Sequence, residues 1–499
     1  MYIIRIKFGF YAAGVFMLFN SLTFIIFFCC FFFLWNGISK YIRPRLWLLF
    51  VASSVFYGWW DWRFLFLIYF TGAVDFFLAL GIEKCTQMPN ERLRNILRKL
   101  CLTLSIVCGI GVLSIFKYSV FFAGQLDHLF GLLGISSNLK SHIPEFCLVL
   151  PVGISFYTFQ SLSYTIDVYR RTLRPTGSFI HYMAYLMLFP QLVAGPIVRA
   201  VDLLPKLVLP VTVSPMIRYN ALKLIALGFF KKCVLADNAA IIVDTAFSNS
   251  QIYTGSLTWW LVMMMFSLQI YCDFSGYSDI ARGLIKFMGF RFNLNFNHPY
   301  IAAGLQNFWS RWHISLSTWF RDYVYIPLGG NRKGKIRTYW NLFLTFLISG
   351  LWHGAALNFI IWGAYHGLLQ ILEKITGYTG YISNIRKFRS RAAIILITQL
   401  EVLIGWVFFR ASSWSESCYV LKRLFSFSSE KNPLKTDVDF WIVFLVFWGM
   451  ELFLILKADT LLLHKYRWYR RLEPILIGLL LLTSIIFRGE KDGFIYFQF

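Results

Sequence analysis

A succession of long apolar runs is the feature that most limits the fold of this chain. Many of them approach the ~20 residues that an α-helix needs to cross a bilayer. After a first run at about 10–35, they lie near 45–60, 63–82, 100–123, 146–166, 181–198, 219–236, 256–275, 338–350, 353–372, 392–409, 438–456 and 473–487. Runs of this length fit helices, whose backbone groups are hydrogen-bonded within the segment. The pattern therefore predicts an all-α, polytopic transmembrane protein.

The composition agrees with a bilayer as the surrounding medium. Hydrophobic residues make up 58% of the chain and charged residues only 14%. The hydrophobic fraction is higher, and the charged fraction lower, than is typical of a soluble protein. The net charge of +24 is the sign expected where loops face anionic cytoplasmic lipid. Because the cations are scattered between apolar runs and form no stripe, we expect no nucleic-acid partner.

Several apolar runs contain helix-breaking residues. Pro151 and Gly153 interrupt one run, and Pro190, Gly195 and Pro196 interrupt another. Irregular backbone at membrane depth persists only where protein or a water-filled cavity covers it. We therefore expect re-entrant or interfacial segments around an internal cavity. No internal repeat or soluble domain is visible, so residues 1–499 are predicted to form a single membrane-embedded domain.

The longest polar interruptions between the runs are 83–99, 170–174, 282–298, 331–337, 386–391 and 412–435. Several are rich in Lys and Arg, as cytoplasmic segments are, but consecutive ones cannot all be cytoplasmic if every intervening run crosses the membrane. The nine cysteines include no CxxC pair, and they lie mostly in apolar runs: Cys29, Cys30, Cys101, Cys108, Cys233 and Cys272. This distribution predicts buried thiols, with neither a disulfide framework nor a zinc site.

His353 is the first candidate for chemistry, because it lies within the apolar segment 349–356. An ionisable group at membrane depth is a functional hypothesis by default. Imidazole has a reference pKa of ~6.5, so a neutral ring accepts a proton near physiological pH. Gly350 and Gly354 flank it at a spacing that permits close approach of a helix or ligand. The alternative is a core histidine whose ring nitrogens are satisfied by backbone carbonyls.

His313 is the second candidate, and it lies in a segment of different character. Between Asn307 and Gly330, tryptophans and tyrosines alternate with charged residues, which is typical of an amphipathic helix at or dipping through an interface. The alternative for the tryptophans is an aromatic anchoring belt. His353 offers His313 a partner, and the two together predict a reaction centre.

Metal and nucleophilic chemistry are less well supported by the sequence. The eight histidines stand singly, without the clustered boxes of membrane desaturases, so we expect no catalytic metal. His353 and His366 would point about 220° apart on a continuous helix. A GxSxG elbow is absent as well. The sequence therefore does not single out a serine as a covalent nucleophile, and a reaction in which a group passes directly between two substrates fits these observations better.

A set of ordered motifs resembles the membrane-bound O-acyltransferases (MBOATs), and within them the bacterial branch that contains the alginate O-acetylation membrane protein. The matching segments are Pro151–Gln160, Leu188–Ile197, Asp273–Asp279, Phe296–Tyr300, Asn307–Ser317, Trp319–Tyr323, Tyr325–Arg332, Leu351–Gly354 and Phe494–Phe499. The resemblance covers most of the chain from about residue 146 onward. It implies a catalytic core at about 146–410.

The resemblance implies a ring of about 11 or more helices, with re-entrant or interfacial helices around a central tunnel. The invariant histidine of the family corresponds to His353, and its second active-site position corresponds to His313. His353 would take the proton of an acceptor hydroxyl. His313 would polarise or position the thioester, or help to stabilise the oxyanion.

Four further residues near His313 are candidates for holding the acyl donor: Arg311, Arg321, Trp312 and Asn307. Anchoring to lipid or a structural role is the alternative for the two arginines. Asp279 and Arg282 have the i,i+3 spacing of a structural ion pair. Asp322 would orient a neighbouring histidine, cap a helix or pair with Arg321.

The branch further implies acetyl-CoA as the donor substrate, with no bound cofactor, and a location in the bacterial inner membrane. An SGNH-type acetyltransferase would be the partner that modifies an exported, alginate-like polysaccharide. Two alternatives remain at this stage. One is transfer of D-alanine from a carrier-protein thioester to teichoic acid. The other is a transporter or flippase without chemistry, for which broken helices around a cavity are equally expected.

Overall fold

The computed structural model describes residues 17–192, 195–378, 380, 382, 388–429, 438–456, 463 and 466–489. Within these ranges the regular secondary structure is helical throughout, as the apolar runs predict. The chain divides into two compact units. The first comprises Met1–Ser119, Ile143–Ser214 and Met288–Phe290, and the second comprises Val120–His142, Pro215–Phe287 and Arg291–Phe499.

The first unit is built from its N-terminal helices and a set of shorter ones. They are α1 (Leu22–Ile38), α2 (Ile42–Asp61), α3 (Arg63–Thr86), α4 (Glu91–Leu113), η2 (Ser114–Tyr118), η4 (Glu145–Leu148), α6 (Ile154–Tyr169), α7 (Phe179–Leu186), α8 (Phe189–Leu192), α9 (Ala200–Leu203) and η5 (Leu204–Val208). Helix α5 (Ser119–Leu132) begins at the boundary between the units.

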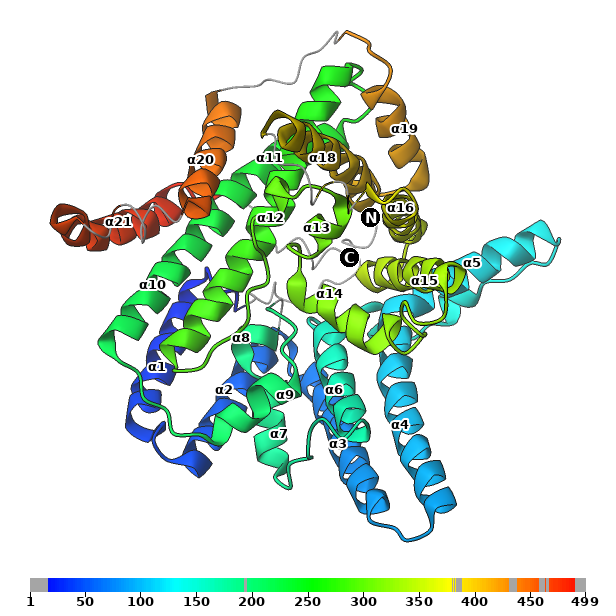
Figure 1. Ribbon diagram of the computed structural model, residues 1–499, viewed down its shortest axis with the longest axis vertical. Coiled ribbons are helices and arrows are strands. Elements are labelled where there is room, and N and C mark those ends of the chain that lie inside the picture. The colour runs from blue at the N-terminus through cyan, green and yellow to red at the C-terminus, as the bar shows by residue number, and fades with distance from the viewer. Residues whose placement is uncertain are drawn as a thin grey trace. The chain divides into compact units, whose positions relative to one another are not determined.

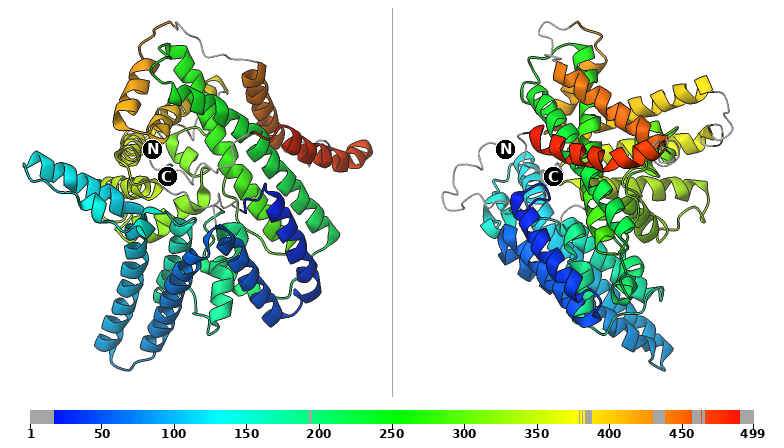
Figure 2. Two further views of the ribbon diagram at one scale, coloured as in Figure 1. Left: turned by 180° about the vertical axis from the view of Figure 1, so that it is seen from behind. Right: turned by 90° about the vertical axis from the view of Figure 1, so that its left-hand side faces the viewer.

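Helix α6 forms the core of the first unit. Nearly all its side chains are buried, and it packs beside α3 and α4 (Figures 1 and 2). Gly153 precedes it with a φ of 73°, in the left-handed region that favours glycine. The helix therefore begins only at Ile154, which confirms that Pro151 and Gly153 interrupt the apolar run.

The second unit contains the longest helix and the segments that bear both candidate histidines. Its helices are η3 (Leu139–His142), α10 (Pro215–Phe229), η6 (Phe230–Ala236), α11 (Asp237–Ser248), α12 (Ser256–Phe287), η7 (Pro299–Ile301), α13 (Leu305–Trp309), α14 (Ile314–Phe320), η8 (Arg321–Tyr325), α15 (Lys335–His353), α16 (Leu357–Ile375), α18 (Phe388–Arg410), α19 (Trp414–Leu424), α20 (Val438–Ile455) and α21 (Arg467–Ile486).

Two helix pairs organise this second unit. Helices α10 and α12 lie side by side (Figures 1 and 2), and most side chains of α12 are buried. Helices α15 and α16 approach each other closely where both carry glycine. A Cβ at Gly350 would overlap the carbonyl oxygen of Phe359, and one at Gly363 would overlap that of Phe346. The predicted close approach at Gly350 is confirmed.

Substitution Gly350→Ala should lower the stability of the protein by about 1–3 kcal/mol, because the added methyl group forces backbone shifts between α15 and α16. The measurement is the thermal unfolding midpoint in detergent. Gly111→Ala in α4 is the matched control, since a Cβ there meets no atom within 4 Å. Equal midpoints for the two variants would contradict the tight contact at Gly350.

Four helical segments among the described residues are long and apolar enough to cross a membrane: Arg63–Thr86, Glu91–Leu132, Ser256–Phe287 and Arg389–Arg410. Leu22–Ile38 and Phe440–Ile455 are apolar but shorter. Other predicted runs are helical but broken. The run at 181–198 becomes α7 and α8, and the run at 219–236 becomes α10 followed by the π-helical turn η6.

One polar interruption is helical, and one prediction from the sequence is wrong. The stretch 83–99 is largely helical, because α3 continues to Thr86 and α4 begins at Glu91, where the Asn90 side chain accepts a hydrogen bond from the amide of Leu93. The cysteines are not all buried, since Cys29 and Cys30 are exposed on α1. An apolar helix can turn such residues toward lipid, so hydrophobic sequence alone does not place them in the core. The start of the first run at about residue 10 and the segment Phe494–Phe499 lie outside the described residues.

Candidate functional site

His353 is the last residue of α15. The chain then turns through residues 354–356, and α16 begins at Leu357. The His353 side chain is only 5% exposed, and its ring lies edge-on to three aromatic rings, with centroid distances of 4.9 Å to Trp352, 5.0 Å to Trp362 and 5.2 Å to Phe409. The helix end thus places a titratable ring inside an aromatic enclosure.

His313 lies between two short helices, at a break in the segment 307–330 that we predicted as one amphipathic helix. That prediction is wrong, because His313 adopts the left-handed conformation with φ of 42° and ψ of 55°. Helix α13 ends at Trp309 and α14 begins at Ile314. A β-carbon makes this backbone conformation unfavourable, and such conformations persist where the surrounding structure holds them.

Both histidines line one cavity of about 530 Å³ in the second unit. Trp352 lies between them, with centroid distances of 6.3 Å to His313 and 4.9 Å to His353. The other lining residues are about equally divided between aromatic or apolar side chains and polar ones: Gln306, Trp309, Trp312, Leu316, Ser317, Phe320, Arg321, Tyr325, Leu342, Thr345, Phe346, Ser349, Gln370, Glu373 and Lys374. The structure therefore brings together the two residues that the sequence singled out separately.

The His313 ring is held by a side chain that the sequence analysis missed. Its Nδ1 atom lies 3.2 Å from Oδ1 of Asn295, and its ring is nearly perpendicular to that of Phe274, at a centroid distance of 4.5 Å. Burial lowers the pKa of His313 to about 3, because desolvation disfavours the imidazolium. The ring is therefore neutral at physiological pH.

The structure separates the four candidate donor-binding residues into two pairs. Trp312 and Arg321 line the cavity. Arg311 and Asn307 are not among its lining residues; Arg311 Nε instead donates to Asn307 Oδ1 at 3.2 Å. Arg321 forms an ion pair with Asp322 at 2.6 Å. Pairing with Arg321, one of the three roles considered for Asp322, is observed.

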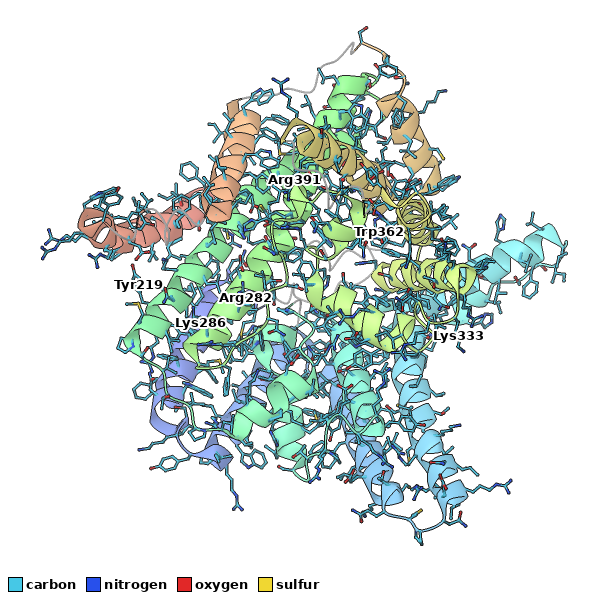
Figure 3. The ribbon with its side chains drawn as sticks, in the orientation of Figure 1. Tyr219, Arg282, Lys286, Lys333, Trp362 and Arg391 are labelled. Carbon is cyan, nitrogen blue, oxygen red and sulfur yellow. The ribbon has the colours of Figure 1, made fainter. Side chains whose placement is uncertain are left out.

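A polar face of α16 was also missed. Trp362, His366, Gln370 and Glu373 follow one another at spacings of four, four and three residues, which place them on one face of a helix. Trp362, labelled in Figure 3, lies between the rings of His353 and His366, at 5.0 Å and 5.1 Å. His353 and His366 thus belong to two separate helices, and the continuous-helix comparison does not apply.

Glu373 ties this face to the segment that carries His313. Its carboxylate accepts hydrogen bonds from the amides of Leu305 at 2.6 Å and Gln306 at 3.1 Å, at the start of α13. A carboxylate is favourable at a helix N-terminus, where backbone N–H groups lack intrahelical partners. The i, i+4 and i+7 spacing of polar residues on an apolar helix was the signal that could have found it.

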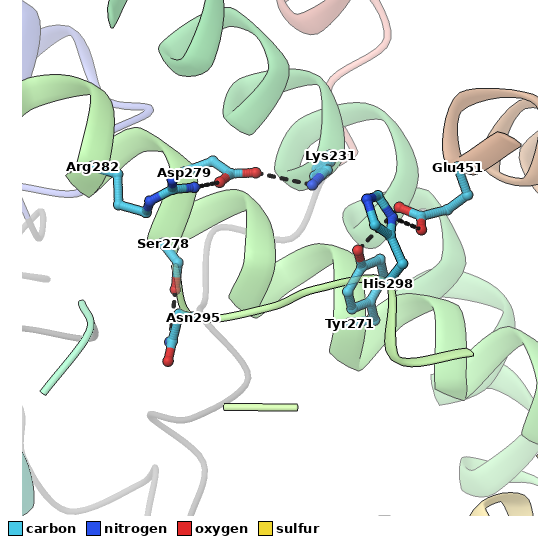
Figure 4. Close-up of polar contacts among 8 residues, drawn as sticks. All are labelled: Lys231, Tyr271, Ser278, Asp279, Arg282, Asn295, His298 and Glu451. Atoms are coloured by element: carbon cyan, nitrogen blue, oxygen red, sulfur yellow. Dashed lines mark hydrogen bonds and ion pairs between the residues drawn. The ribbon is translucent and has the colours of Figure 1, made fainter. Parts of the chain in front are cut away.

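Buried ion pairs surround α12, close to the residues that support His313. Asp279 pairs with Lys231 at 2.9 Å and with Arg282 at 3.0 Å (Figure 4), which confirms the predicted Asp279–Arg282 pair. His298 Nδ1 lies 2.8 Å from the carboxylate of Glu451, which also accepts a hydrogen bond from Tyr271 at 3.0 Å. Charges at this depth remain only when they are paired.

Comparison with known proteins identifies the family of the chain. The model of the MBOAT, membrane-bound O-acyltransferase family matches residues 168–414. A protein of Pseudomonas aeruginosa named probable alginate O-acetylase AlgI is 40% identical over 387 residues, which cover 78% of this chain and 71% of the relative. A peptidoglycan O-acetyltransferase of Helicobacter pylori is 36% identical over 408 residues, covering 76% and 73%. A teichoic acid D-alanyltransferase of Bacillus subtilis is 30% identical over 245 residues, covering 47% and 61%.

The chain belongs to the membrane-bound O-acyltransferase family. It is accordingly an acyltransferase and a multi-pass membrane protein, as the sequence motifs predicted. The alternative of a transporter without chemistry is not supported.

Proposed function

We propose that this protein moves an acetyl group from acetyl-CoA toward an exported, alginate-like polysaccharide. The observation that carries the proposal is the shared cavity of His353 and His313, in a chain 40% identical to a probable alginate O-acetylase. Membrane acyltransfer needs a neutral base, a place for an acyl chain and exclusion of water. The cavity has room for an acyl group, and its two buried imidazoles lie beside the aromatic side chains of Trp309, Trp312 and Phe320.

In the proposed reaction, an acceptor hydroxyl attacks the thioester carbonyl while His353 takes its proton. The carbon–sulfur bond then breaks, and the departing thiolate receives a proton, so that an O-acetyl ester and a free thiol result. No net proton is produced. Proton transfer of this kind requires a hydrogen bond of about 3 Å between base and hydroxyl. Exclusion of water by the aromatic walls strengthens electrostatic stabilisation and protects the thioester from hydrolysis.

The proposal includes the arrangement that the family resemblance implies. A ring of helices would enclose a tunnel in the inner membrane, with acetyl-CoA entering at the cytoplasmic face and the acceptor at the outer face. Arg321 and Trp312, which line the cavity, are the better placed candidates for contacting the donor; Arg311 and Asn307 remain candidates outside it. An SGNH-type acetyltransferase would take the acetyl group onward to the polysaccharide.

Turnover of radiolabelled acetyl-CoA by the purified protein in nanodiscs tests this function. Release of CoA above the rate of empty nanodiscs, increased by a candidate partner or glycan, is the expected result. An inactive wild-type protein, with and without the partner, would count against acetyl-CoA as the donor.

D-alanyl transfer to teichoic acid is the second candidate, because a teichoic acid D-alanyltransferase is a more distant relative. In that case the donor would be a carrier-protein thioester. Supplying D-alanyl-loaded carrier protein in the same nanodisc assay separates the two candidate functions. An acetyltransferase should use acetyl-CoA and not the loaded carrier protein, and a D-alanyltransferase should do the reverse.

A further inference from the structure

Asn295 lies at the centre of the hydrogen bonds that surround His313. Its side chain is buried, with an exposed fraction of 1%. Oδ1 accepts hydrogen bonds from the amide of Ser315 at 3.2 Å and from the Ser315 hydroxyl at 2.9 Å. Nδ2 donates to the hydroxyl of Ser278 on α12 at 3.1 Å, the contact drawn in Figure 4. Asn295 therefore joins α12 to the beginning of α14.

These contacts determine which way the Asn295 amide points. The backbone N–H of Ser315 can only donate, so the Asn295 atom that faces it must be the oxygen. The same oxygen lies 3.2 Å from Nδ1 of His313. The Ser315 hydroxyl also lies 3.4 Å from Nδ1, but it donates its single proton to Oδ1 of Asn295 at 2.9 Å. Two acceptors cannot share a hydrogen bond, so Nδ1 carries the ring proton that the Asn295 oxygen accepts. Since a neutral imidazole has one protonated nitrogen, Nε2 of His313 carries the lone pair.

We infer that Asn295 is a positioning residue for acyl transfer, which holds His313 in the Nδ1–H tautomer so that Nε2 acts as a hydrogen-bond acceptor in the cavity. This inference rests on the proposed function. Among the described residues, Nε2 of His313 has no hydrogen-bonding partner, although the residue lines the cavity. An unpaired acceptor in a buried site is the atom that a reactant N–H or O–H would satisfy.

The tautomer changes the role that His313 can have. In the neutral ring, Nε2 has no proton to donate, so His313 does not stabilise a developing oxyanion through that atom. It accepts a hydrogen bond from a bound reactant instead. Oxyanion stabilisation, which we first considered for His313, then falls to other N–H groups.

The backbone around His313 supports the same interpretation. The main-chain oxygen of Asn295 accepts a hydrogen bond from the amide of Ile314 at 2.9 Å, and its side-chain oxygen accepts from the next amide, that of Ser315. Asn295 thus accepts hydrogen bonds from the two backbone amides that follow the left-handed residue His313, whose φ is 42°. Strained conformations of this kind cluster at functional sites, where neighbouring contacts maintain them.

Asn295→Leu should lower kcat for thioester turnover by roughly 10- to 100-fold, the cost typical of removing the outer hydrogen-bonding partner of a metal-binding histidine, whose tautomer is fixed in the same way. KM should change by less than about threefold, because Asn295 does not line the cavity. Asn293→Leu is the matched control, since Asn293 is an exposed asparagine two residues earlier; its kcat should equal that of the wild type. Wild-type kcat in Asn295→Leu would overturn the inference.

Incorporation of Nδ1-methylhistidine at position 313 separates tautomer control from a structural role. Methylation of Nδ1 leaves the lone pair of the neutral ring on Nε2. An Asn295→Leu protein with Nδ1-methylhistidine at position 313 should therefore have a kcat at least about fivefold higher than Asn295→Leu with ordinary histidine. Nε2-methylhistidine at the same position should abolish turnover. Full activity with Nε2-methylhistidine, or no increase with the Nδ1-methyl form, would overturn the inference.

A spectroscopic measurement keeps the inference testable if Asn295→Leu does not fold. Nitrogen-15 spectra of histidine-labelled wild-type protein in nanodiscs, with His313 identified by its loss in His313→Ala, should show a protonated Nδ1 and an unprotonated Nε2. The opposite tautomer would overturn the inference. If no thioester is turned over by the wild type, the proposed function fails, whereas the tautomer result is independent of activity.

Discussion

His353→Ala should reduce acetyl-CoA turnover by about 10²–10⁴-fold, the contribution typical of a positioned general base. Alanine cannot take the proton of an attacking hydroxyl, and no other titratable histidine shares the His353 position at the end of α15. The measurement is CoA release by monodisperse variant protein in nanodiscs. KM for acetyl-CoA should change much less than kcat if the ring acts mainly in the transition state.

The control for this experiment is His128→Ala, because His128 is an exposed histidine of α5. It should retain wild-type turnover. His353→Ala with undiminished kcat would remove His353 from the mechanism. Loss of turnover in both variants would instead indicate general damage from altering histidines, and would also count against the proposed role.

The sequence singled out the two histidines as candidates for chemistry because each was unusual for its surroundings. His353 is an ionisable residue in an apolar run, and His313 lies in an aromatic segment that is too polar for an ordinary crossing. The sequence predicted that the two would form one reaction centre, but the way in which the chain brings them to one cavity did not follow from those signals, which are forty residues apart. It depends on the helix end at His353 and on the left-handed backbone at His313, and periodicity carries no information about either.

Asn295 shows the other limit of prediction from sequence. Its contact with His313 spans 18 residues and depends on a break between helices. An asparagine in a polar loop gives no sign of such a contact. Glu373 differs, because its helical spacing from His366 and Gln370 was visible in the sequence. The polar face of α16 was therefore predictable, whereas the support of His313 was not.

The fold was predicted best where apolar runs end at recognisable breakers. Gly153 ends one irregular stretch and α6 begins directly after it. The polar interruption 83–99 gave no comparable indication of its structure, because its charged residues occupy the ends of two helices. Polar residues at a helix terminus or on its exposed face are compatible with helix, so polarity alone does not mark a loop in a membrane protein.

Substitution of Lys232 should strongly lower the stability of the protein, because its buried ammonium pairs with two carboxylates. It lies 2.7 Å from Asp237 and 2.7 Å from Asp273, and the side chains of all three are buried. Lys232→Met should destabilise the protein by about 3–5 kcal/mol, since it leaves two buried carboxylates without their cation. The measurement is denaturant or thermal unfolding of the purified protein in detergent.

Two further variants identify the cause of that loss. Lys286→Met, at the partly exposed end of α12, should change stability by no more than about 0.5 kcal/mol. The neutral combination of Lys232→Met with Asp237→Asn and Asp273→Asn should recover more than half of the loss, because buried charge without a partner is the main penalty. A Lys232→Met protein as stable as the Lys286→Met control would show that the pairing contributes little.

The same variant should also impair the site, because α12 carries Asp273 together with two residues that support His313. Phe274 meets the His313 ring, and Ser278 accepts the hydrogen bond of Asn295. A shift of α12 where Asp273 contacts Lys232 would therefore weaken the contacts that hold the His313 ring in the cavity. In the Lys232→Met protein that remains folded at low temperature, kcat should fall by at least about fivefold, while the neutral triple variant should regain most of the activity.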